Sequence, residues 1–413
     1  MARHNTGKKT LLILSGGVEA VPGILRAKAM GLHVVVCDYN ADCPGFAYAD
    51  DTLLVSTYDI NRSVVAASEY HHKVGRIDGV ICMAADVPLT AAHIAKALGL
   101  PGLSLQTAGL AVDKLAMKQH FMAAGIPVPW FSAIDSAGHL AQVVSRHGSN
   151  LIIKPVDSRG ARGVLRLQGG VDLSWAFAYA QACSPTARVM VERYAEGPQV
   201  STETVIMNNQ ATTLGFIDRN YEYLERFSPF IIENGGQQGS SLNAADRCSI
   251  IGLAERAAHV MGISNGIAKG DMVLTAEGPM VIEIAARLSG GWMSSDQIPL
   301  ATGVQIIDVA IQLALGVSPD LTGSTPRDQP GVAIRYFFPD PGLVTNIKNI
   351  EYTNELPWVH RVGFFTEVGD TVAPVTDHTC RAGFVITTGK DREEAVARAK
   401  SVIESVIIET VAA

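Results

Sequence analysis

The 413-residue sequence lacks features that mark several classes of protein. Its apolar run at residues 11–14 is far shorter than the hydrophobic part of a signal peptide or a membrane span, so neither is expected there. The six cysteines are scattered and form no C-x-x-C pair, which argues against a zinc site and favours reduced thiols in a cytoplasmic protein. The formal net charge of −7 offers no basic surplus for a nucleic acid backbone.

Two common nucleotide-binding motifs are also missing. The Ser-Gly-Gly at residues 15–17 is not the G-x-G-x-x-G dinucleotide fingerprint, and no G-K-[ST] follows the glycine-containing stretch at 157–163. What is present is a composition of 47% hydrophobic and 18% charged residues, which is typical of a folded globular protein. The length exceeds what one hydrophobic core holds, so we expect two or three domains.

Short apolar runs alternate with helix-like stretches over the first hundred residues. This alternation predicts a parallel, doubly wound sheet, in which ligands bind at the carboxyl ends of the strands. We therefore expect the loops at 15–17, 38–40 and 84–86 to face one crevice. Further along, polar residues precede stretches of helical periodicity and predict helices that begin near Asp113, Asn243 and Asp391.

The stretch 268–293 has the pattern of a β-hairpin that carries two acids, Asp271 and Glu283. Twelve positions (283 − 271) with a turn at 277–279 between them let the two acids lie opposite each other on adjacent strands. A carboxylate among apolar strand residues is costly to bury unless a cation compensates it. Paired acids close to Arg287 suit Mg²⁺ bound to a polyphosphate, and a structural ion pair between Glu283 and Arg287 is the alternative.

The stretch 151–163 predicts a strand that ends at Lys154 and a loop of small residues and arginines. Glycines in this loop let backbone N–H groups approach an anion, and the arginines add positive charge. We interpret it as a flexible cover for phosphates, with an ordinary basic hairpin as the alternative. Near the C-terminus, Arg335 lies on a predicted strand, where it either reaches a substrate carboxylate or forms a structural ion pair.

In this order, the pieces resemble the ATP-grasp superfamily of carboxylate–amine ligases over the chain from about residue 11 to 316. The motifs that carry the resemblance are residues 113–114, 125–129, 153–155, 157–163, 191–194, 201–203, 271 and 283–287. The resemblance implies an α/β and α+β fold class. Its parts would be a Rossmann-like domain at 1–108, a two-subdomain ATP-grasp core at 109–318 with a nucleotide-gripping lid at about 130–205, and a small α+β domain at 319–413.

The resemblance also implies which residues contact ATP. Those expected at the phosphates are Lys114, Lys154, Ser158, Gly160 and Gly163, with Lys154 also catalytic. Those expected at adenine and ribose are Glu192, Tyr194, Gln199 and Glu203. From the residues alone, Glu192 and Glu203 could equally be solvated edge charges.

A second set of roles follows from the same resemblance. Asp271 and Glu283 would bind Mg²⁺, with Mn²⁺ as a substitute, and Arg287 would stabilise an acyl phosphate. The residues expected to contact the substrate are Arg287, Ser289, Gly290, Gly291 and Glu233. Ala285 stands where the family often has a metal-binding asparagine, so a bound metal would have one protein ligand fewer.

Within the family, the stretch after Arg287 resembles the L-amino acid ligase and carbamoyl-phosphate-synthase-like branch. This implies an ATP-dependent ligase that activates a small carboxylate, an amino acid in this branch, as an acyl phosphate and joins it to an amine. The expected partners are small molecules, without nucleic acid or membrane, and homodimers are common in the family. The alternatives are a bicarbonate-using enzyme of the carbamoyl-phosphate-synthase or biotin-carboxylase type, and a non-catalytic ATP-binding regulator.

Overall fold

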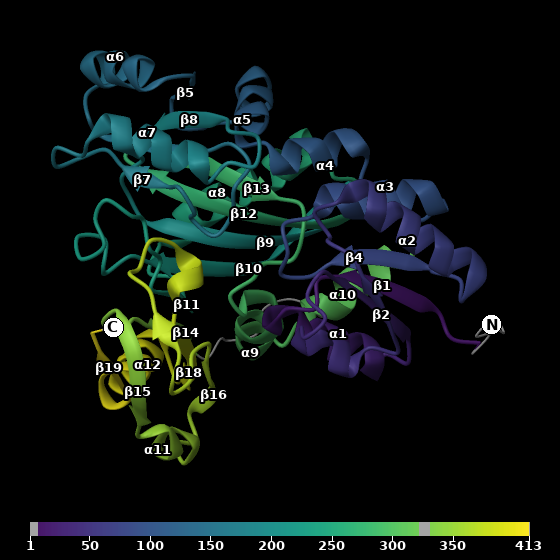
Figure 1. The fold of residues 1–413 in the computed structure, drawn as a ribbon. Helices are drawn as coiled ribbons and strands as arrows, with labels where there is room; N and C mark the ends of the chain where they lie inside the picture. Colours follow the sequence, from purple (N-terminus) through teal and green to yellow (C-terminus); the bar gives the residue numbers. More distant parts are fainter. Residues whose placement is uncertain (1–6, 322–330, 413) are drawn as a thin grey trace.

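Residues 7–321 and 331–412 are described in the computed structural model, and they form four β-sheets (Figure 1). The first sheet is parallel, with the strand order β3-β2-β1-β4. Its strands are β1 Thr10–Leu14, β2 His33–Asp38, β3 Asp51–Leu54 and β4 Gly79–Cys82. The helices of this part are α1 Val21–Ala29, α2 Ile60–Lys73, α3 Pro88–Leu98 and α4 Leu105–Val112. The predicted doubly wound sheet is confirmed.

Alternation along β1 explains why this sheet has helices on both faces. Leu11 and Ile13 are buried in one cluster with α1, whereas Leu12 and Leu14 are buried in another with α2 and α3. Successive strand residues point to opposite faces, so a strand that is apolar throughout must be covered twice. The four residues of this run are 0% exposed, which fits that requirement.

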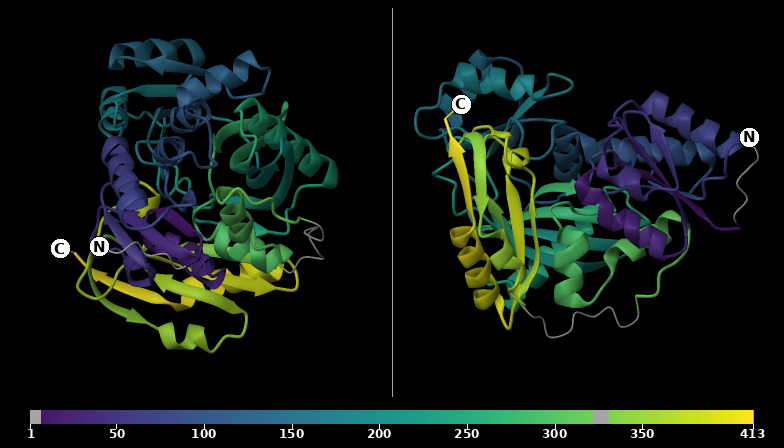
Figure 2. Two further views of the ribbon diagram at one scale, coloured as in Figure 1. Left: turned by 90° about the vertical axis from the view of Figure 1, so that its right-hand side faces the viewer. Right: turned by 60° about the horizontal axis from the view of Figure 1, so that its bottom comes forward.

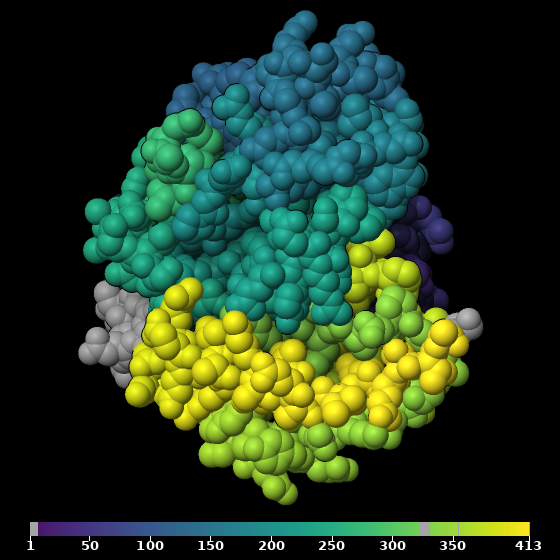
Figure 3. Space-filling view, turned by 90° about the vertical axis from the view of Figure 1, so that its left-hand side faces the viewer, coloured from purple at the N-terminus to yellow at the C-terminus, as the bar shows by residue number. Residues whose placement is uncertain are grey.

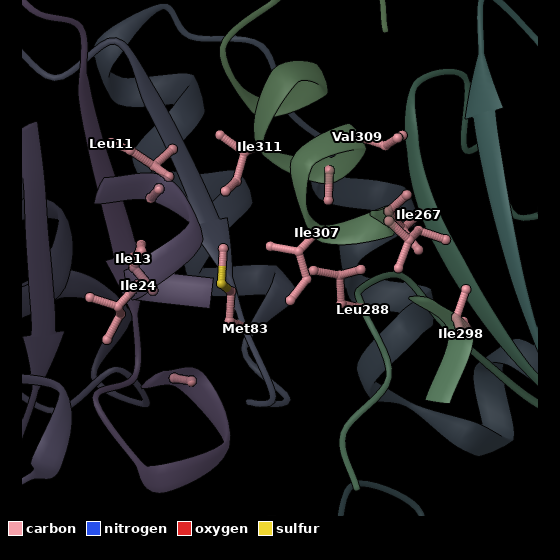
Figure 4. Packing of buried hydrophobic residues seen from close by; sticks show 14 of the residues in the cluster. Leu11, Ile13, Ile24, Met83, Ile267, Leu288, Ile298, Ile307, Val309 and Ile311 are labelled. Carbon is pink, nitrogen blue, oxygen red and sulfur yellow. The ribbon is translucent and has the colours of Figure 1, made fainter. Parts of the chain in front are cut away.

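Helix α10 (Ile306–Ala314) connects the first sheet to the rest of the molecule. One hydrophobic cluster includes side chains of α10, of β1, of α1 and of strand β12 (Figure 4). Ile307 and Ile311 lie on the helix between Leu11 on one side and Ile267 on the other (Figure 4). The first sheet is therefore held to the central sheet through a continuous apolar core.

A second, antiparallel sheet with the order β5-β8-β6-β7 forms a separate lid module. Its elements are β5 Phe131–Ile134, α6 Ala137–His147, β6 Leu151–Pro155, β7 Leu165–Arg166, α7 Leu173–Ala182 and β8 Val189–Arg193. Helix α5 (Lys114–Ala123) leads into this module from the first part of the chain. The module lies at the top in Figure 1 and in both views of Figure 2.

The third sheet is the central one and has eight antiparallel strands in the order β13-β12-β9-β10-β11-β14-β18-β16. These are β9 Gln199–Met207, β10 Gln210–Asn220, β11 Gly235–Gln238, β12 Gly266–Thr275, β13 Gly278–Ala285, β14 Gly331–Phe337, β16 Val359–Phe364 and β18 Gly383–Gly389. Helix α8 (Ala244–Val260) packs on its β12–β13 end, and α9 (Ile298–Thr302) precedes α10.

The sheets divide the chain differently from the predicted domains. Strand β9 belongs to the central sheet, so the predicted upper limit of the lid at residue 205 lies inside that sheet. Strands β14, β18 and β16 continue the same sheet past the predicted boundary at 318/319. The predicted small C-terminal domain therefore shares its main sheet with the part that precedes it, because residues 332–335 of β14 pair with the four residues of β11.

A fourth, three-stranded sheet completes the C-terminal part, which lies at the bottom in Figure 3, below the teal segments and the lid module. Its elements are β15 Gly342–Lys348, α11 Ile350–Asn354, β17 Thr371–Val372, α12 Arg392–Ser405 and β19 Ile407–Val411. Helix α12 packs on β14 and β18. Within residues 7–321 and 331–412, no helix combines the length and apolar character needed to cross a bilayer.

Candidate active site

A cavity of about 720 Å³ lies where the first sheet, the lid module and the central sheet meet. The loops that follow β1, β2 and β4 contribute to its lining, as the strand pattern predicted. The predicted site residues that line it are Lys114, Lys154, Ser158, Gly160, Glu192, Tyr194, Gln199, Glu233, Asp271, Glu283, Arg287, Ser289, Gly290 and Gly291. Gly163 and Glu203 are not among the lining residues.

Asp271 and Glu283 are directly opposite each other in the β12–β13 ladder, and a register shift follows immediately after Asp271. Residues paired across a ladder point to the same face, so both carboxylates are directed at the cavity. Asp271 is surrounded by donors: Ser201 Oγ lies 2.8 Å away, Arg219 Nη1 lies 3.1 Å away, and Lys269 Nζ also contacts it. Burial alone would raise the pKa of Asp271, but these cations outweigh burial and lower it.

Glu283 is neutralised by a cation from α5. Its Oε1 lies 3.2 Å from Lys114 Nζ, and the same ammonium donates to the backbone oxygen of Ser158 at 2.7 Å. Burial lowers the pKa of Lys114, but Glu283 and neighbouring carboxylates raise it above its ordinary value. Lys114 therefore connects a predicted metal ligand to the predicted phosphate loop.

Arg287 is paired with an acid of the first sheet rather than with Glu283. Its Nε donates to Asp86 Oδ1 at 2.7 Å, and its Nη1 donates to the backbone oxygen of Leu288 at 2.9 Å. Burial opposes ionisation of Asp86, yet Arg287 lowers the pKa of that carboxyl below its usual range. The alternative of a structural Glu283–Arg287 ion pair is thus wrong.

Lys154 belongs to a buried charge triad with Glu192 and Lys118. Lys154 Nζ donates to Glu192 Oε1 at 2.5 Å, and Lys118 Nζ lies 2.9 Å from Glu192 Oε2. Burial would raise the pKa of Glu192, but the two ammonium groups lower it to about 2. Burial lowers the pKa of Lys118 to about 8 against the opposing effect of Glu192. Lys118 is four positions after Lys114, and this helical spacing is the sequence signal that could have revealed it.

Comparison with known proteins identifies the family. A family model described as an ATP-grasp domain matches residues 111–291, and one described as the L-amino acid ligase C-terminal domain 2 matches residues 335–411. A D-alanine–D-alanine ligase of Synechococcus sp. is 31% identical over 259 residues, which are 56% of this chain and 75% of that protein. The chain belongs to the ATP-grasp family. It is a carboxylate–amine ligase that uses ATP and releases ADP, as the sequence resemblance implied.

More distant similarities extend over nearly the whole chain. An uncharacterised protein of Sinorhizobium fredii is 23% identical over 411 residues, which are 97% of this chain and 82% of that protein. The crystal structure of an L-amino acid ligase from Bacillus licheniformis has a TM-score of 0.84 at 21% identity and covers 100% of both chains. A phosphoribosylglycinamide synthetase from Anaerococcus prevotii has a TM-score of 0.75 at 16% identity and covers 98% of this chain and 100% of that one. The fold shared with these two structures therefore includes the C-terminal part of this chain.

The two residues predicted to contact adenine, Glu192 and Tyr194, both line the cavity of this ATP-grasp chain. Both carboxylate oxygens of Glu192 contact ammonium groups. The backbone N–H of Tyr194 donates to Asn150 at 3.0 Å and is also engaged. The Tyr194 ring lies under the Arg166 guanidinium at 4.2 Å and still lines the cavity. Tyr194 is therefore placed to offer a ring surface, whereas its backbone N–H is already engaged.

The predictions for Glu203 and Gly163 need correction, because neither residue lines the cavity. Glu203 is 0% exposed and accepts hydrogen bonds from Ser289 N at 3.1 Å and Ser294 Oγ at 2.9 Å, so it supports the loop after Arg287 from below instead of facing a ribose. Burial raises its pKa. Gly163 has φ +74°, and a Cβ there would lie 2.8 Å from Pro155, so close packing requires this glycine.

The lining residues that were not singled out from the sequence include five with a charged or imidazole side chain: Glu19, Arg219, Lys269, His378 and Arg381. Arg219 Nε donates to Glu233 Oε2 at 2.7 Å while its Nη1 contacts Asp271. Glu19 Oε2 accepts a hydrogen bond from the Gly291 N–H at 2.8 Å. Isolated charges on strands and loops carry no motif, and only Lys269, two positions before Asp271, stood inside a recognised stretch. The predicted ion pair of Arg335 is wrong, because its guanidinium donates to Ile334 O and Gln237 Oε1 and lies outside the cavity.

Asp271 and Glu283 can hold a divalent ion if a bound nucleotide supplies the remaining oxygen ligands. Among residues 7–321 and 331–412, no group of three or more His, Cys, Asp or Glu side chains is arranged to hold a metal. Ala285 is buried beside the acids and offers no side-chain ligand. Mg²⁺ takes only one or two protein carboxylates at phosphate sites and completes its shell with phosphate oxygens and water. Asp271 and Glu283 fit that donor set, with the nucleotide supplying the remaining oxygens.

Proposed function

We propose that this ligase binds MgATP and an α-amino acid in one cavity, activates the amino acid carboxylate as an acyl phosphate and transfers the acyl group to an amine. The observation that carries the proposal is the opposition of Asp271 and Glu283 in a cavity that also contains Lys114, Lys154 and Arg287. Three cations and an acidic pair at one point fit a polyphosphate with a divalent ion better than any neutral ligand. All six cysteines are free, and we infer a cytoplasmic location.

At the phosphate end, the lysines would act as point charges on the triphosphate. Lys114 already contacts the loop oxygen of Ser158, so it can hold that loop against the phosphates while it neutralises them. Lys154 would exchange part of its contact with Glu192 for a phosphate oxygen, and Lys118 would keep Glu192 in place. Gly160 has φ +63° and open space around it, which fits backbone contact with an anion.

Asp271 and Glu283 would hold Mg²⁺, with Mn²⁺ as a substitute. When bound, this ion would neutralise charge on the transferred phosphoryl group. Lys269 and Arg219, which contact Asp271, would keep that carboxylate ionised and oriented. Lys269 is paired with Ala285 across the ladder, so an ammonium group stands beside the position that lacks a family ligand.

The carboxylate of the substrate would lie between Arg287 and the backbone of residues 289–291. Gly291 has φ +62°, and a Cβ there would lie 2.8 Å from Tyr336 Oη, so the loop approaches its surroundings closely. Arg287 is oriented by Asp86 and can stabilise charge on a tetrahedral acyl centre. Glu19, which already accepts from Gly291 N–H, provides a negative group that an α-ammonium would require.

The chemistry proceeds in two balanced steps. A carboxylate oxygen forms a bond to the γ-phosphorus of ATP, and the bond from that phosphorus to the β-phosphate oxygen breaks and releases ADP. The nitrogen lone pair of the amine then forms a C–N bond to the acyl carbon, and the bond from that carbon to the phosphate oxygen breaks. Inorganic phosphate leaves, and the surplus proton of the amine passes to phosphate or solvent. The chain's own contribution is positioning and charge neutralisation.

A screen of single amino acids with ATP, Mg²⁺ and hydroxylamine tests this function. Hydroxylamine captures an acyl phosphate as a hydroxamate, so it reports activation without requiring the natural amine. We expect ADP and hydroxamate to appear together for a limited set of amino acids. ADP formation that depends on bicarbonate and on no amino acid would contradict the proposal, as would ATP binding by calorimetry without any ADP formation.

A further inference from the structure

One face of the β12–β13 hairpin presents a square of four cavity-lining residues: Lys269, Asp271, Glu283 and Ala285. Lys269 pairs with Ala285 across the ladder. Two positions along, Asp271 pairs with Glu283, and residues two apart on a strand share a face. The acidic pair therefore has an ammonium group beside one acid and a methyl group beside the other. These two neighbours decide how many divalent ions the pair can hold.

Both oxygens of Asp271 are already engaged by protein donors. Its Oδ1 lies 2.8 Å from Ser201 Oγ and 3.1 Å from Arg219 Nη1, and these two donors use both lone pairs of that oxygen. Its Oδ2 contacts the ammonium of Lys269. Among the contacts of residues 7–321 and 331–412, this leaves Asp271 one lone pair, on Oδ2, for a metal ion.

Glu283 is more open to a metal ion than Asp271. Its ion pair with Lys114 is made through Oε1, at 3.2 Å, and no donor in the described parts of the chain, 7–321 and 331–412, hydrogen-bonds to Oε2. With Asp271 Oδ2, Glu283 offers one divalent ion the two carboxylates that are usual for Mg²⁺ at phosphates. A second ion would need side-chain ligands of its own, and the methyl group of Ala285 provides none.

The ammonium of Lys269 also opposes a second divalent ion by its charge. It is held at Asp271, with a side chain that is only 18% exposed. A second ion on Asp271 would share one carboxylate with this ammonium, and like charges so close together repel strongly inside a protein. Phosphoryl transfer still requires cations around the phosphate oxygens, and some enzymes supply them as two divalent ions. In this site an ammonium group is present where a second ion would otherwise bind.

We propose that the site takes a single divalent ion with ATP, and that the Lys269 ammonium acts in place of a second ion. The inference rests on the proposed function of the site. It gives Lys269 a catalytic role at the triphosphate, in addition to its contact with Asp271. The ammonium would neutralise charge on the transferred phosphoryl group as a point charge. Such an enzyme requires no free Mg²⁺ beyond the ion that arrives with the nucleotide.

Counting the Mn²⁺ ions bound per nucleotide tests this inference. Protein in excess over a non-hydrolysable ATP analogue is titrated with Mn²⁺, and electron paramagnetic resonance measures the ion that stays free. We expect one analogue-dependent Mn²⁺ ion for the wild type. The double variant Lys269→Met, Ala285→Asn removes the ammonium and adds an amide oxygen, which is a suitable Mn²⁺ ligand. We expect it to bind two ions, with the spin-coupled spectrum of ions about 4 Å apart.

Hydroxamate formation at saturating MgATP provides a second measurement, which does not depend on the double variant. The wild-type rate should not change when free Mg²⁺ is raised. Lys269→Met should lose at least about tenfold in kcat and regain part of it as free Mg²⁺ rises, because a metal ion can replace the missing charge. Lys269→Arg keeps a cation, so it should lose less activity and should not respond to free Mg²⁺.

The matched control is Lys348→Met. Lys348 also pairs with a carboxylate on a neighbouring strand, that of Glu409, but it lies outside the cavity, so this variant should bind one ion and keep wild-type activity. Two analogue-dependent ions in the wild type, or only one in the double variant, would overturn the inference and leave the proposed function intact. No binding of the analogue by the wild type, or binding without any Mn²⁺, would overturn the proposed function itself.

Discussion

Arg287 and Asp86 are 201 positions apart in the chain, yet their side chains meet with Nε and Oδ1 2.7 Å apart. Asp86 follows β4 of the first sheet, and Arg287 follows β13 of the central sheet. Their contact joins the two layers at the cavity and fixes the direction in which the guanidinium points. A bidentate or fork-like donor is effective only when it is held in orientation, so Asp86 acts on the reaction through Arg287.

Replacement of Asp86 tests this positioning role. Asp86→Asn should lower kcat by roughly 10- to 100-fold with little change in the KM for ATP, because Arg287 remains but loses its charged partner. Hydroxamate and ADP assays at saturating ATP measure the effect. Asp78→Asn is the control, since Asp78 pairs with Arg76 at the opposite end of β4. Equal losses in both variants would show that the effect is one of stability alone.

The loop after Arg287 allows a prediction of how alanine at Gly291 changes stability and activity. Gly291 and Gly303 both have positive φ, at +62° and +78°, but an added Cβ meets Tyr336 Oη at 2.8 Å only at Gly291, with nothing within 4 Å at Gly303. Alanine at either position should cost about 1 kcal/mol of stability from backbone strain. Gly291→Ala should in addition lose activity by at least tenfold. Thermal unfolding and hydroxamate formation separate the two effects, and equal activities of the two variants would contradict a close role for this loop.

The buried triad of Glu192, Lys154 and Lys118 allows a prediction of how the stability of the protein depends on pH. The pKa of Glu192 is lowered from 4.5 to about 2 in the folded protein, so the unfolded chain binds more protons between these values and stability rises with pH there. This contribution is complete above pH 4.5 and is lost as the pH falls toward 2. The melting temperature of Glu192→Gln should therefore fall furthest below that of the wild type above pH 4.5, and the gap should narrow in acid. A gap that is constant from pH 3 to pH 7 would contradict the triad.

Much of the site could be predicted because local patterns encode it. The hairpin of Asp271 and Glu283 follows from strand spacing and a turn, and its register is as expected. The predicted helix starts are confirmed, since Asp113, Asn243 and Asp391 each cap a helix with their side chains. These features depend on residues close in sequence, where propensity and capping determine the structure.

The contacts that sequence analysis missed join segments that are far apart in the sequence. The sequence contains no sign that Asp86 would pair with Arg287, and the helical spacing of Lys118 from Lys114 does not name Glu192 as its partner. The sequence also contains no motif that predicts that Arg381, just before β18, lines the cavity. Such pairings depend on how sheets are stacked, and the continuation of the central sheet through β14 was itself unexpected. These pairings are determined by tertiary packing and cannot be predicted from the spacing of residues in the sequence.

The most direct test of the central claim is ADP formation by Asp271→Asn and Glu283→Gln. Glu277→Gln is the matched control, because Glu277 is an exposed carboxylate on the turn of the same hairpin. With folding checked by circular dichroism, we predict that each cavity variant loses at least about 100-fold in kcat, because a charge that positions the phosphoryl group is removed, while the control keeps wild-type activity. Turnover of Asp271→Asn and Glu283→Gln within about threefold of the wild type would contradict the account.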